Sequence, residues 1–127
     1  LGFRFKGGTA RLDAQSRSNV QLLAQLVAAG VYDGKELIFA GFSDGQGPAA
    51  ANERLSEKRA GAVRNSVLAA LGDAAEPGFF QTLVRGFGEA MPLACDDVAW
   101  GRGLNRRVEI WVRDSPTDIP STENSTQ

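Results

Sequence analysis

Apolar residues recur along the chain with two different periods, and these periods predict where the helices and strands lie. Over residues 14–29, four apolar side chains follow the spacing i, i+3, i+4 and i+7, which is typical of an amphipathic helix. They are Val20, Leu23, Ala24 and Val27. Asp13 is placed to cap the start of this helix, and Gly30 is a suitable residue to end it.

A second helix is predicted over residues 48–71, where apolar side chains return at multiples of four positions and so form one ridge. The ridge consists of Leu55, Val63, Val67 and Leu71. Pro48 suits the first turn of a helix, and Gly72 suits its end.

Short segments bounded by turn residues predict four strands, at residues 1–5, 35–42, 79–86 and 104–113. The last one alternates: Val108, Ile110 and Val112 face one way, whereas Arg107, Glu109 and Trp111 face the other, so one face of it is covered. The order strand–helix–strand–helix–strand–strand predicts an α/β (α+β) two-layer sandwich. Both helices are expected on one face of a mixed four-stranded sheet.

The end of the chain has a different composition. Residues 114–127 read DSPTDIPSTENSTQ, with one aliphatic residue and many Ser, Thr and Pro. Such a segment cannot bury enough apolar surface to fold, so residues 1–113 are expected to form the domain and residues 114–127 a disordered tail.

Composition and charge exclude several functions. The net charge of −1 over 127 residues, without a basic face, argues against a nucleic-acid binder. Histidine is absent, which removes the commonest general base and zinc ligand, and the single Cys95 permits no internal disulfide. No apolar run reaches the ~20 residues that span a bilayer. Because the chain starts without methionine and at a predicted strand, we expect a module of a longer protein.

Two charges stand where folding alone would not place them. Asp44 follows a predicted buried strand, and Arg59 lies on the apolar ridge of the second helix, with Asn52 two turns before it on the same side. The two charges can pair with each other, as partly buried arginines often do. Alternatively, they can bracket a zwitterion, Asp44 accepting from an ammonium and Arg59 gripping a carboxylate. Geometry leaves both interpretations open.

Two enzymatic or cofactor-binding interpretations are weaker. Residues 45–50, GQGPAA, fit the dinucleotide fingerprint G-x-G-x-x-A, but Pro48 stiffens the turn, Asp44 would repel a pyrophosphate, and the next strand ends at Arg85 instead of an acidic residue. A two-carboxylate glycosidase could be built from Asp96 and Asp97 with Glu89 and Asp44, but these acids are better explained as loop residues on a solvated surface. No cofactor, metal or catalytic residue is therefore expected.

Two motifs resemble the signatures of OmpA-like peptidoglycan-binding domains. The first is G-F-S-D followed after a glycine-containing gap by N-x-x-L-S-x-x-R-A-x-x-V, from Gly41 to Val63. The second is G-x-G-E, then Pro, then G-R-x-x-N-R-R-V-E, from Gly86 to Glu109. The resemblance covers about residues 3–113 without large gaps, and it agrees with the order of elements predicted above.

The resemblance implies a non-enzymatic, non-covalent binder of the peptide stem of Gram-negative peptidoglycan, whose meso-diaminopimelate ends in an amine and a carboxylate. By resemblance, the ammonium is bound by Asp44, the carboxylate by Arg59, and further hydrogen bonds come from Asn52. Ser43 and Arg106 line the same pocket. Leu55, one turn before Arg59 on the ridge, completes the expected ligand-binding set.

The resemblance also implies a setting. The chain is expected in the periplasm, associated with the outer membrane, as the anchor of a larger envelope protein whose remainder is N-terminal to it; a homodimer is a further expectation. Gly8 stands where many members carry a polar residue, which keeps open an alternative: an interaction or oligomerisation module with a vestigial pocket. Arg107, on the strand face opposite Arg106, is expected to pair with surface acids.

Overall fold

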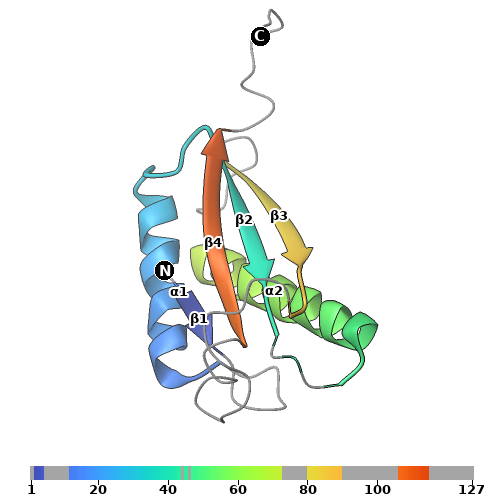
Figure 1. The fold of residues 1–127 in the computed structure, drawn as a ribbon. Coiled ribbons are helices and arrows are strands. Elements are labelled where there is room, and N and C mark those ends of the chain that lie inside the picture. Colours follow the sequence, from blue (N-terminus) through green and yellow to red (C-terminus); the bar gives the residue numbers. More distant parts are fainter. Residues whose placement is uncertain are drawn as a thin grey trace, which may run out of the picture.

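A computed structural model describes residues 2–4, 12–43, 45, 47–72, 80–89 and 106–114 of the chain (Figure 1). Two helices and four strands follow one another in the predicted order. They are β1 (Gly2–Arg4), α1 (Ala14–Ala28), β2 (Lys35–Gly41), α2 (Ala49–Leu71), β3 (Phe80–Gly86) and β4 (Arg107–Asp114).

The four strands form one sheet in the order β1-β4-β2-β3. β2 pairs in parallel with β3, to which α2 connects it, and β4 lies antiparallel to both β2 and β1. Both helices cover the same side of this mixed sheet (Figure 1). The predicted two-layer α/β sandwich is therefore confirmed.

The first helix begins and ends where its capping residues predict. The Asp13 carboxylate accepts a hydrogen bond from the backbone N–H of Ser16 at 2.8 Å and so satisfies a donor that has no partner within the helix. Gly30 follows the helix with φ +83°, a conformation that costs a glycine little. All four residues of the predicted apolar stripe are buried.

The hydrophobic core fills the space between the helices and one face of the sheet. The sheet contributes Phe3, Leu37, Phe39 and Val108, each fully buried. The predicted alternation of β4 holds here, since Val108 and Ile110 contact this core. Burial of one such side chain is worth about 1.5–3 kcal/mol, so this layer supplies most of the stability of the fold.

The N-terminal half of α2 lies directly on the ends of β2 and β3, because glycine occupies both contact points. A Cβ atom placed on Gly41 would lie 2.0 Å from the carbonyl oxygen of Ser56, and one on Gly86 would lie 2.6 Å from the backbone nitrogen of Glu57. No side chain fits in either gap. The helix backbone therefore approaches the sheet more closely here than side chains normally permit.

Hydrogen bonds hold this close contact. The buried Ser56 hydroxyl accepts from the N–H of Gly88 at 2.9 Å and donates to the carbonyl of Glu53 at 2.8 Å. The carbonyl of Gly88 in turn accepts from the N–H of Ser43 at 2.6 Å. The start of α2, the residues after β3 and the residues after β2 are thus linked in series.

The other face of the sheet carries an aromatic cluster, which we define as Phe42, Phe87 and Trp111. The Phe42 and Phe87 rings stack with centroids 5.4 Å apart, and Trp111 packs 5.3 Å from Phe87. Arg107 lies over the Phe42 ring, with its guanidinium carbon 4.0 Å from the centroid. Its Nε donates to Glu109 at 2.5 Å. The prediction that Arg107 pairs with an acid is confirmed, but the pair is not on the open surface: the Arg107 side chain is only 6% exposed.

The predicted element bounds differ from the structure by up to three residues. β4 begins at Arg107, not at residue 104, and continues to Asp114, whose carboxylate pairs with Lys35 at 2.5 Å. This end of the strand is therefore part of the sheet and not the start of the tail. The sequence also predicts a long loop over residues 88–103, with Cys95; residues 90–105 and the part of the predicted tail beyond Asp114 lie outside the described residues.

Substitution of Gly41 by alanine is expected to destabilise the domain by about 3 kcal/mol or more, because the new methyl group would meet helix backbone that cannot rotate away. Chemical denaturation of the purified domain measures the effect. The matched control is Gly61→Ala in α2: a Cβ atom there meets nothing within 4 Å, so the change should stabilise the helix by about 0.5–1 kcal/mol. Equal effects of the two substitutions would contradict the close-contact interpretation.

A pH dependence follows from Glu109. Burial raises the pKa of this carboxyl, but hydrogen bonds from Arg107 and Trp111 and the charge of Arg107 outweigh it, and the pKa lies below its ordinary value of 4.5. Because the folded-state pKa is lowered, the stabilisation is present at neutral pH and is lost as the pH falls through that pKa. Glu109→Gln should therefore cost about 1 kcal/mol of unfolding free energy at neutral pH, with the difference vanishing in acid.

Asp114→Asn is the control for this titration. The pKa of Asp114 is also lowered, by its hydrogen bond to Lys35, but the carboxylate is fully exposed and salt screens the pair. Its effect should disappear in high salt, whereas that of Glu109→Gln should largely remain. If the unfolding free energies of wild type and Glu109→Gln changed in parallel with pH, Glu109 would not be the group whose titration changes the stability.

Candidate functional site

The candidate site lies at the end of the sheet where α2 begins. Asn52 and Arg59 come from the face of α2 that packs on the sheet, and both are buried, Arg59 to 1% exposure and Asn52 to 8%. Arg59 is the largest fully buried side chain among the described residues. A guanidinium in such a position is stable only with anionic or hydrogen-bonding partners around it.

Ser43 and Arg106 approach the same place from the sheet. Phe42 and Arg107 exchange two backbone hydrogen bonds, of 2.7 and 3.3 Å, which extend the β2–β4 pairing by one step beyond Gly41 and Val108. The next step of this register sets Ser43 opposite Arg106. Since side chains alternate along a strand, both belong to the side of Gly41 and Val108, which is the side of α2.

Ser43 has a side chain suited to a ligand. It is 4% exposed, and its hydroxyl oxygen makes no hydrogen bond with any residue of the described part of the chain. A buried hydroxyl without a partner costs free energy, and a polar ligand atom would offset that cost. Ser43 thus supplies a buried hydroxyl directly before the predicted ligand-binding Asp44.

The turn before α2 is shaped by Gly47. This residue has φ +88°, and its carbonyl accepts a long hydrogen bond of 3.5 Å from the side-chain amide of Asn52. Pro48 precedes the first helical residue and provides no side-chain cap. Without such a cap, the first N–H groups and the partial positive charge of the helix N-terminus make this end of α2 favourable for an anion.

Two predicted ligand-binding residues need separate mention. Asp44 lies outside the described residues, so its pairing with Arg59, with a ligand or with both stays a prediction. Leu55 is half-buried and lies outside the hydrophobic core cluster. Its apolar surface is thus near the start of α2 without being needed by the core.

The structure gives contacts to three residues that the sequence analysis did not place in the ligand-binding set. Ser56 and Gly88 connect α2 to the loops that carry the site, and Arg107 lies behind Phe42. A signal for Ser56 exists in the sequence, because it falls on the buried side of the helix three positions before Arg59. Its partner Gly88 could not be found in that way, since it lies 32 positions further along the chain.

Metal and membrane chemistry receive no support from the described residues. Within them, no group of three or more Cys, Asp or Glu side chains is placed to hold a metal ion. None of the helices in that part of the chain is both long and apolar enough to cross a bilayer.

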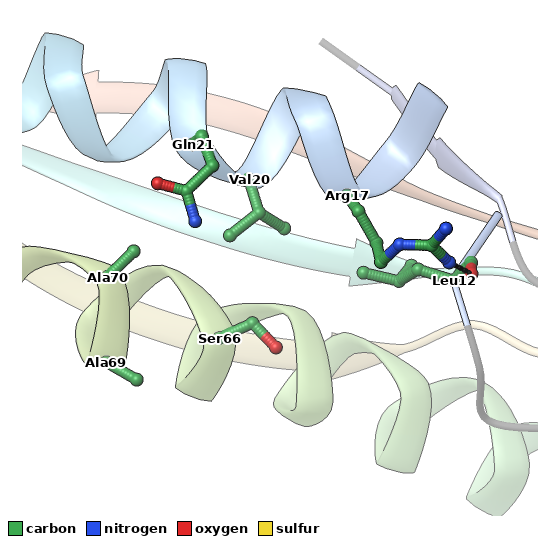
Figure 2. Close-up of a pocket in the computed structure, with 7 residues that line it drawn as sticks. All are labelled: Leu12, Arg17, Val20, Gln21, Ser66, Ala69 and Ala70. Atoms are coloured by element: carbon green, nitrogen blue, oxygen red, sulfur yellow. Dashed lines mark hydrogen bonds between the residues drawn. The ribbon is translucent and has the colours of Figure 1, made fainter. Parts of the chain in front are cut away.

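A groove of about 430 Å³ lies between α1 and α2, away from these residues (Figure 2). Arg17 and Gln21 of α1 line it from one side, and Ser66 and Ala70 of α2 from the other. Ser66 lies about two helical turns beyond Arg59, so this groove is distinct from the candidate site.

Comparison with known proteins agrees with the geometry. Residues 4–106 match the model of the OmpA family. Two curated relatives, both named outer membrane porin F, are 32% identical in Pseudomonas aeruginosa and 31% identical in Pseudomonas fluorescens, over 112 residues each. The matches cover 88% of this chain but only 30% and 32% of the relatives, so the chain spans about a third of their length.

Solved structures show the same fold. The peptidoglycan-associated lipoprotein of Burkholderia pseudomallei matches with a TM-score of 0.73 and 23% identity, over 88% of this chain and 89% of that one. The C-terminal domain of Helicobacter pylori MotB matches with a TM-score of 0.72 and 18% identity, over 93% and 88% of the two chains. The cell wall anchor of the T6SS from Pseudomonas aeruginosa matches with a TM-score of 0.64 and 25% identity, over 90% and 79%. With most of its length matched by the family model, the chain belongs to the OmpA family.

Proposed function

We propose that this domain binds the peptide stem of peptidoglycan non-covalently, through the zwitterionic end of meso-diaminopimelate, and so anchors a larger envelope protein to the cell wall. The observation that carries the proposal is the burial of Arg59: a fully buried guanidinium on the same buried side of α2 as Asn52, in a domain of the OmpA family. Such a guanidinium suits the two-pronged binding of a carboxylate.

The relatives support this function. One structural neighbour is named a peptidoglycan-associated lipoprotein and another a cell wall anchor, and the curated relatives are outer-membrane proteins. The OmpA family is a family of structural, cell-wall-anchoring domains and not of enzymes. We therefore assign the domain to the periplasmic side of the envelope of a Gram-negative bacterium.

The proposed binding mode gives a role to Asp44 and Arg59, the two charges that folding alone would not place there. Arg59 binds the distal carboxylate of the diaminopimelate, and Asp44 accepts hydrogen bonds from its ammonium. Asn52 and the Ser43 hydroxyl bind the remaining polar atoms, Arg106, directly before β4, lines the pocket, and Leu55 contacts the aliphatic part of the ligand. Each charge then has an opposite charge as its partner, which is the condition for burying both.

Removal of either charge is expected to release the domain from cell walls. Wild-type protein should co-sediment with purified sacculi, and Arg59→Ala or Asp44→Ala should stay in the supernatant, because one charged group of the ligand then loses its charged partner on the protein. Quantification of pelleted and soluble protein checks this result.

The control is Arg54→Ala, which removes the same charge from the exposed side of the same helix and should sediment as wild type does. Circular dichroism of each variant verifies that it is folded. If folded Arg59→Ala sediments as fully as wild type, the ligand assignment is wrong. If wild type itself stays soluble, the domain acts instead as an interaction or oligomerisation module with a vestigial pocket.

Discrimination between diaminopimelate and lysine tests whether Arg59 binds the distal carboxylate. Lysine lacks the distal carboxylate, so its binding would leave Arg59 without that partner, at a cost of about 1.5–3 kcal/mol. Free meso-diaminopimelate should therefore displace the domain from sacculi at concentrations about 10- to 100-fold lower than lysine does. Equal potency of the two amino acids would show that Arg59 does not bind a carboxylate.

A further inference from the structure

Arg107 lies next to the proposed ligand-binding residues in the chain, but on the opposite face of the sheet. Its guanidinium carbon is 4.0 Å from the centre of the Phe42 ring, which is itself 1% exposed. Phe42 directly precedes Ser43, and Arg107 directly follows Arg106. The pair of residues on the outer face is therefore covalently attached to the pair on the ligand face.

Backbone hydrogen bonds join the same two residues. The N–H of Phe42 donates to the carbonyl of Arg107 at 2.7 Å, and the N–H of Arg107 donates to the carbonyl of Phe42 at 3.3 Å. In the β2–β4 register, this pair lies one step before Ser43 and Arg106. Side-chain stacking of Arg107 on Phe42 and the backbone pairing therefore stabilise the same register at one point.

Arg107 is in turn held by residues further along its own strand. Its Nε donates to one carboxylate oxygen of Glu109 at 2.5 Å, and the other oxygen accepts from the indole N–H of Trp111 at 3.0 Å. Trp111 packs on Phe42 and Phe87, with ring centroids 6.2 and 5.3 Å away. Glu109 thus holds the edge of the Arg107 guanidinium, and the Phe42 ring holds its face. Because the guanidinium is planar and rigid, it loses little conformational freedom in such a site.

We infer that Arg107 is a positioning residue for stem-peptide binding: stacked on Phe42 and held by Glu109, it sets the register in which Ser43 and Arg106 face the ligand. This inference rests on the proposed function. Arg107 itself does not contact the ligand, because its side chain belongs to the face opposite α2 and Arg59. Its loss should change affinity by displacing the two ligand-facing residues, since binding is sensitive to small displacements of positioned groups.

The test compares Arg107→Met and Arg107→Lys with Arg85→Met. Arg85 is an exposed arginine on the same face of the sheet, opposite Ala40 in the β2–β3 register, so its substitution removes an equal charge without touching Phe42. The probe is a soluble muropeptide carrying meso-diaminopimelate, titrated by calorimetry well below the unfolding transition of each variant.

Arg107→Met should weaken binding about tenfold, the equivalent of losing one desolvated stacking contact, whereas Arg85→Met should bind within about twofold of wild type. Arg107→Lys should fall between them, because an ammonium keeps the charge over the ring but not the planar fork. A role in stability alone would lower the unfolding midpoint of Arg107→Met and leave its Kd unchanged, and that result would overturn the inference. So would equal weakening by Arg85→Met, which would show a general effect of charge.

A double-mutant cycle with Glu109→Gln supplies a second readout. If Glu109 acts by holding Arg107, the double variant should bind no more weakly than Arg107→Met alone. Additive losses would overturn this part of the inference, and the cycle can be completed with Arg107→Lys if Arg107→Met does not fold.

Amide hydrogen exchange separates failure of this inference from failure of the proposed function. In Arg107→Met the N–H groups of Phe42 and Ser43 should exchange faster, while that of Phe39 in the core strand should change little. If wild type does not bind the muropeptide, the proposed function is wrong, and the exchange rates alone then decide whether Arg107 sets the register. If wild type binds, but the amides of Phe42 and Ser43 exchange at the same rates in wild type and in Arg107→Met, the positioning role of Arg107 is wrong.

Discussion

The structure depends on the close contact between the backbone of α2 and the ends of β2 and β3. Gly41 and Gly86 leave no room for a Cβ atom beneath the helix, and Ser56 closes the contact with a buried hydrogen bond to Gly88. A helix held so near the sheet brings its own side chains to the level of the strand ends. This contact sets how close the buried side chains of Asn52 and Arg59 lie to the strand ends.

The same strand ends also serve the outer face of the sheet. Along β2 and β4 the side chains alternate, so Phe42 and Arg107 point to one side and their neighbours Ser43 and Arg106 to the other. Apolar and cation–π contacts on the outer face can thereby fix polar groups on the inner face. Because contacts on the outer face hold the register of β2 and β4, the Ser43 hydroxyl and the Arg59 guanidinium on the inner face need not pair with each other to hold it.

Burial of Arg59 is costly for folding, and under the proposed function it is useful for recognition. A buried guanidinium discriminates strongly between ligands with and without a carboxylate, because a mismatched ligand leaves a charge desolvated and poorly paired. The fold offsets the cost with a continuous apolar core from α1, α2 and the inner face of the sheet. Membership of the OmpA family is consistent with this arrangement, since a cell-wall anchor needs a selective, rigid site and no chemistry.

The sequence by itself determined the elements, their order and the buried position of Asn52 and Arg59 on α2. Periodicity and local capping decide these features, and both act within a few residues: Asp13 caps α1, and the stripe containing Asn52 and Arg59 is buried as its spacing predicts. The strand order β1-β4-β2-β3, the contact of Ser56 with Gly88, and the burial of Arg107 against Phe42 were decided only by the tertiary structure. Each joins residues more than thirty positions apart, and no local propensity encodes which distant backbone a glycine or an arginine will meet.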